Sequence, residues 1–323
     1  MKIGCKLFMV ALTAPLLIGI LNFKAEAQVI KQWGQNGDIP VPGDYDKDLK
    51  TDIAVWRPSN GAWYVINSFT GQVVIRQWGA KDDIPVPGDY DNDGQTDFAV
   101  WRPSNSIWFV INSSTGQVST KQLGQNGDMP VPGDYDNDGK TDIAVWRPSN
   151  GTWFVINSST GQLSTKQWGQ NGDIPVPGNY NNPLKTDFAV WRPSNGNWYV
   201  INSSTTANSS IVEQNTTQLG QNGDIPVPGD YNNDRRTDFA VWQPSNGTWY
   251  VINNLASQRV NSLTSQGINS LANQIFNSLT GQVNTKQWGS AGDTPVPGNY
   301  DSPARSNFAV WRPSNGTWYI LGN

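Results

Sequence analysis

One sequence pattern recurs six times along this chain and limits the folds that it can adopt. In the clearest copy, residues 133–146 read Gly-Asp-Tyr-Asp-Asn-Asp-Gly-Lys-Thr-Asp-Ile-Ala-Val-Trp. The first half places carboxylates on alternate residues around a glycine, and the second half is a short apolar run. The final tryptophan recurs at intervals of 45, 45, 45, 51 and 69 residues, at Trp56, Trp101, Trp146, Trp191, Trp242 and Trp311. Repeats of this size are single units that must stack on their neighbours to bury an apolar core.

Each repeat contains four strand candidates. In the third repeat they cover residues 129–135, 141–147, 152–157 and 162–168. The second candidate is apolar on both faces, as expected for a strand between two neighbouring sheets. Pro148-Ser149-Asn150-Gly151 has the composition of a tight turn between the second and third strands. The sequence therefore predicts an all-β fold, a β-propeller of six four-stranded blades.

The two ends of the repeat region complement each other. Residues 28–34 match the closing strand of other units, such as residues 72–79, whereas the chain stops just after the third strand of unit six. We therefore expect residues 28–323 to form a single propeller in which the N-terminal strand completes the last blade. Insertions lengthen the chain near 206–216 and 253–278. The second consists of repeated octads that suit either an excrescent loop or a short helix.

The first 27 residues have the features of an export signal. Lys2 and Lys6 precede an apolar run over residues 7–21, and Ala25-Glu26-Ala27 is a small-x-small cleavage site. The apolar run is short for a membrane span, so we expect residues 1–27 to be a signal peptide and the protein to be secreted or held at the cell surface. Cys5 is the only cysteine. The mature chain must therefore be stabilised without disulfides.

The acidic half of the repeat has the spacing of a calcium loop. Asp-x-Asp-x-Asp-Gly-x-x-Asp offers three carboxylates on alternate residues of a turn and a fourth carboxylate four residues later. Calcium takes six to eight oxygen ligands, and the glycine allows a turn in which a main-chain carbonyl, such as that of Lys140, becomes a further ligand. Without a cation these carboxylates would repel one another. The chain contains no histidine, so a preference for zinc or copper is excluded.

Four of the six units keep enough of this loop to predict a metal site. The second and third are complete, the first has Leu49 at the glycine position, and the fifth has one amide and Arg235 there. The candidate ligands, with the fourth residue of each set acting through its carbonyl, are Asp89, Asp91, Asp93, Gln95 and Asp97; Asp134, Asp136, Asp138, Lys140 and Asp142; Asp44, Asp46, Asp48, Lys50 and Asp52; and Asp230, Asn232, Asp234, Arg236 and Asp238. Units four and six carry Pro183 and Pro303 in degraded loops, where we expect no metal.

The run from Val-Pro-Gly-Asp-Tyr through Asp-Asn-Asp-Gly-Lys-Thr-Asp to Ile-Ala-Val-Trp resembles the FG-GAP/VCBS repeat of bacterial secreted proteins, which is related to the repeats of integrin α-subunit propellers. The resemblance covers nearly all of residues 28–323. It implies a β-propeller with calcium in the loop between the first two strands of a blade, on the residues just named. Integrin propellers have seven blades, so the prediction of six rests on the repeats of this chain.

Two further sets of residues recur once per unit. Each second tryptophan follows the first by seven residues and has two interpretations, packing between blades or a stacking surface for a sugar ring; these residues are Trp63, Trp108, Trp153, Trp198, Trp249 and Trp318. An arginine precedes the turn proline in five units and is replaced by Gln243 in the other. Such a ring of arginines would either hold an anionic or hydroxyl-rich ligand or form local hydrogen bonds to turns and aspartates.

Composition excludes several functions. The net charge of −4, without a basic stripe, argues against nucleic-acid binding. The absence of histidine and of cysteine after residue 27 excludes the common nucleophilic triads and histidine-metal chemistry. We therefore expect no enzyme, although two carboxylates would suffice for a glycosidase. The prediction is a calcium-binding adhesion or binding module for a glycan or an extracellular protein, without a membrane span after signal cleavage. The alternative is a structural, self-associating surface protein.

Overall fold

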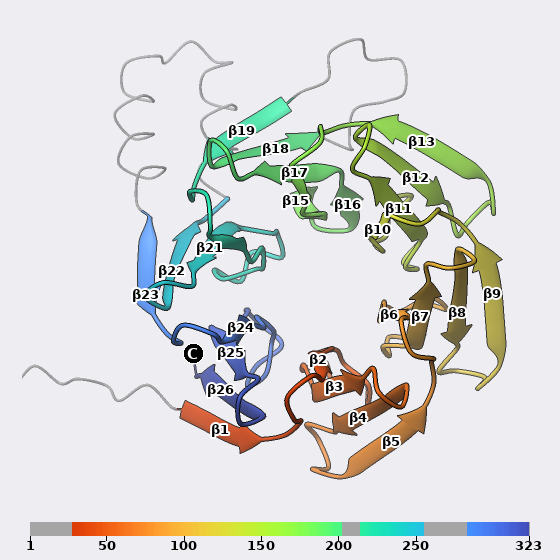
Figure 1. The fold of residues 1–323 in the computed structure, drawn as a ribbon, viewed down its shortest axis with the longest axis horizontal. Helices are drawn as coiled ribbons and strands as arrows, with labels where there is room; N and C mark the ends of the chain where they lie inside the picture. The colour runs from red at the N-terminus through yellow and green to blue at the C-terminus, as the bar shows by residue number, and fades with distance from the viewer. Residues whose placement is uncertain (1–27, 202–213, 255–282, 323) are drawn as a thin grey trace, which may run out of the picture.

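The protein consists of six four-stranded antiparallel sheets arranged around a ring, as a computed structural model describes for residues 28–201, 214–254 and 283–322 (Figure 1). In blades one to three the strands are β2 (Ile39–Pro40), β3 (Ile53–Arg57), β4 (Ala62–Ile66) and β5 (Val73–Gln77); β6 (Ile84–Pro85), β7 (Phe98–Arg102), β8 (Ile107–Ile111) and β9 (Val118–Gln122); and β10 (Met129–Pro130), β11 (Ile143–Arg147), β12 (Thr152–Ile156) and β13 (Leu163–Gln167). The six-bladed β-propeller predicted from the repeats is confirmed.

Blades four to six follow the same order with two variations. Their strands are β14 (Ile174–Pro175), β17 (Ala189–Arg192), β18 (Asn197–Ile201) and β19 (Gln214–Gln218); β20 (Ile225–Pro226), β21 (Phe239–Gln243), β22 (Thr248–Ile252) and β23 (Asn284–Gln287); and β24 (Thr294–Pro295), β25 (Ala309–Arg312), β26 (Thr317–Leu321) and β1 (Gln28–Gln32). Blade four adds a hairpin of β15 (Gly178–Asn182) and β16 (Lys185–Asp187). The loop-or-helix alternative for the insertion near 253–278, and most of the insertion near 206–216, lie outside the described residues.

The first strand of each blade is shorter than the sequence suggests. In blade three we expected residues 129–135, but β10 contains only Met129 and Pro130. The prolines at 130 and 132 have no N–H to donate to a ladder, so pairing continues only through Val131 N–H to the Ala144 carbonyl and an isolated bridge at Gly133. The chain then leaves the sheet and enters the acidic loop.

Paired tryptophans form the core of each blade. Trp146 on β11 faces Trp153 on β12, both are fully buried, and both indole N–H groups donate to the Trp168 carbonyl, at 3.1 and 2.9 Å. Trp153 also contacts the ring of Phe188, which belongs to blade four, with centroids 5.4 Å apart. Aromatic side chains therefore fill the space within a blade and the space between neighbouring blades.

The N-terminal strand lies in the last blade. β1 pairs antiparallel with β26, from Gln28 opposite Leu321 to Gln32 opposite Thr317 (Figure 1). The carbonyl of the next residue, Trp33, accepts the indole N–H groups of both core tryptophans of that blade, at 3.2 and 3.0 Å. β1 therefore takes the place that the fourth strand fills in the other blades.

A threonine clasp joins neighbouring blades at the acidic loops. Thr141 of blade three donates its N–H to the Asp89 carbonyl of blade two at 2.7 Å. The same pairing links blade one back to blade six, where Thr51 N–H donates to the Asn299 carbonyl and Thr51 Oγ1 accepts the Asn299 N–H. Thr141 packs so closely that a Cβ on Gly88 would lie 2.9 Å from its Cγ2 and Oγ1 atoms. The glycine before each first loop residue therefore makes room for the next blade.

Replacing Gly88 with alanine is expected to lower the free energy of unfolding by about 1–3 kcal/mol, because the new methyl group overpacks the contact with Thr141. Urea denaturation of the Gly88→Ala variant measures this change. The double variant Gly88→Ala/Thr141→Ser removes the clashing Cγ2 and is expected to recover part of the loss. Equal stability of Gly88→Ala and wild type would show that the clasp is not tightly packed.

Candidate metal centre

The first aspartate of each acidic loop shapes the turn. In blade one, Asp44 accepts the N–H groups of Lys47 and Leu49 at 2.7 and 2.8 Å, and both of these residues have positive φ. Blades two and three have the easily accommodated glycine at the second of these positions, whereas blade one holds Leu49 at φ 68°. The missing glycine in blade one thus costs some backbone strain but does not change the loop.

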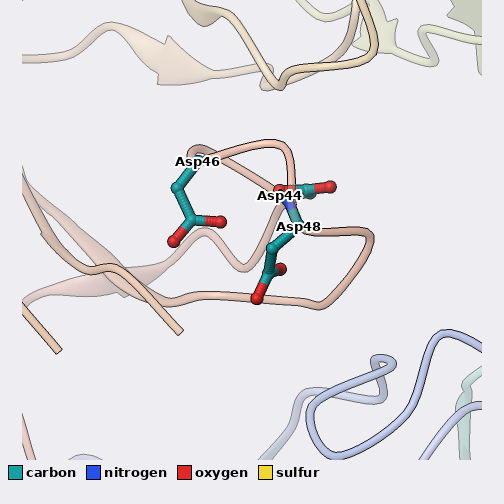
Figure 2. Close-up of side chains that lie close together, drawn as sticks. All are labelled: Asp44, Asp46 and Asp48. Atoms are coloured by element: carbon teal, nitrogen blue, oxygen red, sulfur yellow. Dashed lines mark hydrogen bonds between the residues drawn. The ribbon is translucent and has the colours of Figure 1, made fainter. Parts of the chain in front are cut away.

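The structure brings three carboxylates together in each of blades one, two and three. Figure 2 shows the three side chains of blade one on one turn of backbone. Each residue contributes an oxygen, and these oxygens lie within 4.8 Å of one another; the three groups are Asp44, Asp46 and Asp48; Asp89, Asp91 and Asp97; and Asp134, Asp136 and Asp142. The other predicted ligands of these loops, Asp52, Asp93 and Asp138, fall outside the three-oxygen groups.

The second aspartate of each of these loops carries a buried oxygen without a hydrogen-bond partner. The atoms are Oδ1 of Asp46, Asp91 and Asp136. A buried carboxylate oxygen without a donor is costly unless a cation compensates it. All three loops show the same unsatisfied atom at the same position, beside two further carboxylates. The donor set consists entirely of hard oxygens, which fits calcium better than a transition metal.

The last aspartate of the loop, at the start of the second strand, is fully buried. In blade one, Asp52 accepts the N–H groups of Tyr45 and Ser68, at 2.7 and 2.6 Å. Burial is the main cause that raises the pKa of Asp52 to about 6, and it also raises the pKa of Asp97 and of Asp142. A bound cation would stabilise the charged form of each of these groups and lower the pKa.

The turn between the third and fourth strands caps the loop, which sequence reasoning missed. In blade two, Ser113 Oγ donates to Asp93 at 3.1 Å and Ser114 Oγ donates to Asp91 at 2.5 Å. In blade one, Phe69 N–H donates to Asp46 at 3.1 Å. The turn follows the aspartates by 20 to 23 residues in the sequence, so the spacing of the loop residues gave no sign of the contact.

Blade five differs from the first three. The Asn232 side chain donates its N–H to Asp234 and Asp238 at 3.3 and 3.2 Å, so an amide stands among the carboxylates. Within the described part of the chain, Asp230, Asp234 and Asp238 do not form a three-carboxylate group. Burial raises the pKa of Asp238 to about 7. The amide satisfies these carboxylates without a cation, so blade five is the weakest of the four predicted sites.

Blades four and six also satisfy their loops with amides. In blade four, Asn181 Nδ2 donates to Asp187 at 3.1 Å, and in blade six Asn307 Nδ2 donates to Asp301 at 2.9 Å. The four residues predicted to act through their carbonyls, Lys50, Gln95, Lys140 and Arg236, donate their N–H groups to the third loop aspartate at 2.8–2.9 Å. Ligation by their carbonyls stays a prediction.

The proposed sugar-stacking role of the second tryptophans is wrong. The side chains of Trp63, Trp108, Trp153, Trp198, Trp249 and Trp318 are 0% exposed. Each one lies on the third strand opposite the first tryptophan, and its indole faces the neighbouring core instead of solvent. An indole with no accessible face cannot stack on a ligand, so these residues are core residues, as the alternative interpretation held.

The recurring arginines pair with aspartates within their own blade. Of the two interpretations, ligand binding or local hydrogen bonding, the structure shows the local one. Arg57 donates from Nε and Nη2 to the two oxygens of Asp38, at 2.7 and 2.9 Å. Its Cζ lies 4.3 Å from the centroid of the Tyr64 ring. The same arrangement recurs in four other blades, as Arg102–Asp83–Phe109, Arg147–Asp128–Phe154, Arg192–Asp173–Tyr199 and Arg312–Asp293–Tyr319.

In protein stripped of metal, stability is expected to fall as the pH rises from about 4 to about 7. The folded-state pKa of Asp52, about 6, and of Asp238, about 7, lie above their ordinary value of 3.8. The folded protein therefore holds these protons more tightly than the unfolded chain. The protonated carboxyl groups therefore stabilise the folded state. This stabilisation is fully present at a pH below the pKa of the same groups in the unfolded chain, and it is lost as the pH rises through their pKa in the folded state.

Thermal unfolding in chelator at pH 4.5, 6.0 and 7.5 measures this dependence. The Asp52→Asn variant removes one of the titrating groups and is expected to flatten the profile near pH 6. A melting temperature that rises steadily with pH in the wild type would contradict the assignment of raised pKa values to these carboxyl groups.

Known proteins resemble this chain in one repeat and in overall fold. Residues 89–145 match the model of the FG-GAP-like repeat, from the acidic loop of blade two to the second strand of blade three. A search of curated protein sequences found no significant match. Within the described ranges, no helix is long and apolar enough to cross a bilayer.

Several solved structures share the fold at low sequence identity. Hydrazine synthase of Kuenenia stuttgartiensis has a TM-score of 0.54 at 11% identity, over 88% of this chain and 83% of that one. BBS1N, in complex with ARL6DN, has a TM-score of 0.51 at 10% identity, over 91% and 95%. A chain of the mitotic checkpoint complex has a TM-score of 0.50 at 10% identity, over 99% and 100%. These likenesses concern the fold alone. The protein is a six-bladed β-propeller that contains an FG-GAP-like repeat at residues 89–145.

Proposed function

We propose that this protein is an exported, calcium-braced propeller that acts as a non-catalytic binding module for extracellular proteins. The observation that carries the calcium assignment is the buried, partnerless Oδ1 of Asp46, Asp91 and Asp136, each within a group of three carboxylates. Calcium would supply the positive charge that these oxygens lack. In each loop it would be held by the grouped aspartates and by the carbonyl two residues after the third loop aspartate, at Lys50, Gln95 and Lys140.

A protein ligand fits the surface better than a glycan. The twelve core tryptophans are buried, which leaves no indole of that set to stack on a sugar. Blade one instead exposes three apolar side chains, Phe69, Val73 and Ile75, which are 80, 50 and 62% exposed. Phe69 lies on the turn that hydrogen-bonds to Asp46. Metal binding in that loop would therefore steady the turn that presents Phe69.

The alternative of a self-associating structural protein is disfavoured by the outer strands. A lysine or arginine recurs on the outer strand in five of the six blades, at the position paired with the second tryptophan: Lys31, Arg76, Lys121, Lys166 and Lys286. Charged residues on edge strands oppose the pairing of sheets between molecules. The non-catalytic assignment is supported by the absence of histidine and by the even distribution of aspartates over the repeats.

Calorimetric titration of calcium into chelator-stripped protein tests the metal assignment. The wild type is expected to bind three ions, and Asp46→Asn, Asp91→Asn and Asp136→Asn are each expected to remove one. Asp234→Asn, in the amide-satisfied loop of blade five, is the control and should leave three. No calcium binding by the wild type would overturn the proposal.

The binding role needs a separate measurement. Immobilised protein is exposed to the extracellular proteins of its source with calcium or with chelator, beside the double variant Phe69→Ser/Ile75→Ser. We expect a specific protein to be retained with calcium and lost in the other two conditions. Retention of glycans on an array, or concentration-dependent oligomers in sedimentation, would favour the lectin and structural alternatives respectively.

A further inference from the structure

Five blades share an arrangement that we call the guanidinium seat. It consists of an aspartate before the first strand, an aromatic ring on the third strand and an arginine at the end of the second strand. In blade four, Arg192 binds both oxygens of Asp173 at 2.7 and 2.9 Å, and its Cζ lies 4.4 Å from the centroid of Tyr199. The planar, forked guanidinium suits a carboxylate and an aromatic face at the same time.

Blade five keeps the seat but lacks the arginine. Asp224 and Tyr250 occupy the aspartate and aromatic positions, and Gln243 stands in place of arginine. The Asp224 carboxylate is held as in the other blades, since its Oδ2 accepts the Gln221 N–H at 3.0 Å. The Gln243 oxygen accepts from Asn246 at 2.8 Å and from Tyr250 at 3.4 Å. Its side chain also hydrogen-bonds to Asp224 but brings neither the charge nor the forked N–H groups of a guanidinium.

Among the residues that the structure describes, Asp224 is buried without a cationic partner. The residue is only 8% exposed, and across residues 28–201, 214–254 and 283–322 no lysine or arginine forms an ion pair with it. Burial raises the pKa of its carboxyl group, and hydrogen bonds from the Gln221 backbone and from the Gln243 side chain only partly offset this effect. A buried carboxylate of this kind gains most from a ligand that brings its own positive charge and N–H donors.

A cavity gives access to the carboxylate. It measures about 430 Å³, and Asp224, Gln243 and Tyr250 form part of its wall. The corresponding cavity of blade four, about 370 Å³, is lined by Arg192 and Tyr199 and not by Asp173, which the arginine covers. The aspartate of blade five therefore borders a cavity, whereas the aspartate of blade four does not.

We propose that the seat of blade five binds a guanidinium group supplied from outside the blade. Asp224 accepts two parallel N–H donors from it, and the face of Tyr250 stacks on its plane, as the chain's own arginines do in five other blades. An ammonium group satisfies the carboxylate as a point charge but does not match both the fork and the ring. The inference deepens the proposed binding role by naming a ligand class. It does not depend on calcium, because the acidic loop ends at Asp238, directly before β21, whereas Gln243 is the last residue of that strand.

Calorimetric titration of the full chain in calcium with N-acetyl-L-arginine amide tests this proposal. N-acetyl-L-citrulline amide, which has the same shape without the charge, is the control ligand. We expect one site for the arginine derivative and at least ten-fold weaker binding of the citrulline derivative. Asp224→Asn is expected to weaken arginine binding at least ten-fold.

Two substitutions exchange the arginine of blade four and the glutamine of blade five. Gln243→Arg restores the pattern of the other five blades and is expected to abolish binding while raising the melting temperature by a few degrees. Arg192→Gln empties the seat of blade four, which has the same tyrosine as blade five, and is expected to create a second site. Binding of the arginine derivative to Gln243→Arg as tightly as to wild type would overturn the proposal, as would the absence of binding to wild type.

Two further titrations identify the source of the guanidinium. An arginine-containing pentapeptide that binds at least ten-fold more tightly than the amino-acid derivative assigns the seat to an arginine of a partner polypeptide. Equal affinities assign it to a small guanidino compound. Arg259 of this chain lies outside the described residues, so an Arg259→Ala variant is titrated in parallel. Binding that appears only in that variant would show that the chain fills its own seat and would overturn an external ligand.

Discussion

Chelation of calcium is expected to lower the melting temperature of this protein by on the order of 15 °C. Three loops each place a partnerless buried oxygen beside two other carboxylates. A metal bound only by the folded state stabilises by about 2.7 kcal/mol per site at a concentration 100 times Kd, or roughly 8 kcal/mol for three independent sites. Each kcal/mol is worth roughly 2 °C in a domain of this size.

The Asp91→Asn variant sharpens this prediction because the sign of its effect depends on calcium. In calcium it is expected to be less stable than wild type by about one third of the calcium-dependent stabilisation, since one of three sites is lost. In chelator it is expected to be at least as stable as wild type, because one of the repelling charges has gone. Differential scanning calorimetry of the variant and the wild type in calcium and in chelator measures this change of sign.

Asp234→Asn in blade five is the matched control and should not change the response to calcium, because Asn232 already satisfies that loop. Calcium should also reverse the pH profile of the metal-free protein, since ions bind to ionised carboxylates and their stabilisation grows as the pH rises. An identical melting temperature in calcium and in chelator would show that metal does not stabilise this fold.

Replacing Trp153 with alanine is expected to cost about 3–5 kcal/mol of unfolding free energy, the largest effect of any single substitution proposed for this chain. Its indole is fully buried and packs edge-on against Tyr135 and Phe188, with centroid distances of 6.3 and 5.4 Å. Truncation therefore opens a cavity within blade three and removes a contact with blade four.

The conservative variant Trp153→Phe separates packing from hydrogen bonding. It keeps an aromatic ring but loses the N–H that donates to the Trp168 carbonyl at 2.9 Å, although Trp146 still donates to that carbonyl. We expect it to lie between wild type and Trp153→Ala in urea denaturation. A loss below about 1 kcal/mol for the alanine variant would mean that the blades are not held together by these rings.

The repeat period and the apolar second strand were sufficient to predict the blades. Ile143 to Arg147 form the second strand of blade three almost as expected, because a strand that is apolar on both faces can be satisfied only between two sheets. The predicted length of the first strand was wrong. The first strand of blade three is two residues long because Pro130 and Pro132 end its ladder.

The grouping of carboxylates in the structure follows the ranking of the acidic loops by sequence only in part. Blades two and three were predicted to be the best metal sites, and both bring three carboxylates together. Blade one does so as well without the glycine, because Leu49 accepts a positive φ when Asp44 binds its N–H. Blade five does not, because Asn232 turns its amide toward two aspartates. The direction in which an amide points depends on its neighbours and cannot be inferred from spacing.

By itself, the sequence determined the number of blades, the positions of the second and third strands and the residues that carry hard oxygen atoms. These features follow from periodicity and residue type, which act over a few neighbouring residues. Only the tertiary structure decided that the second tryptophans are buried, that serine turns cap the acidic loops and that the recurring arginines pair with the aspartates before the first strands. These facts depend on contacts between residues 15 or more positions apart, such as Trp153 with Trp168, where the packing of whole blades sets burial and partners.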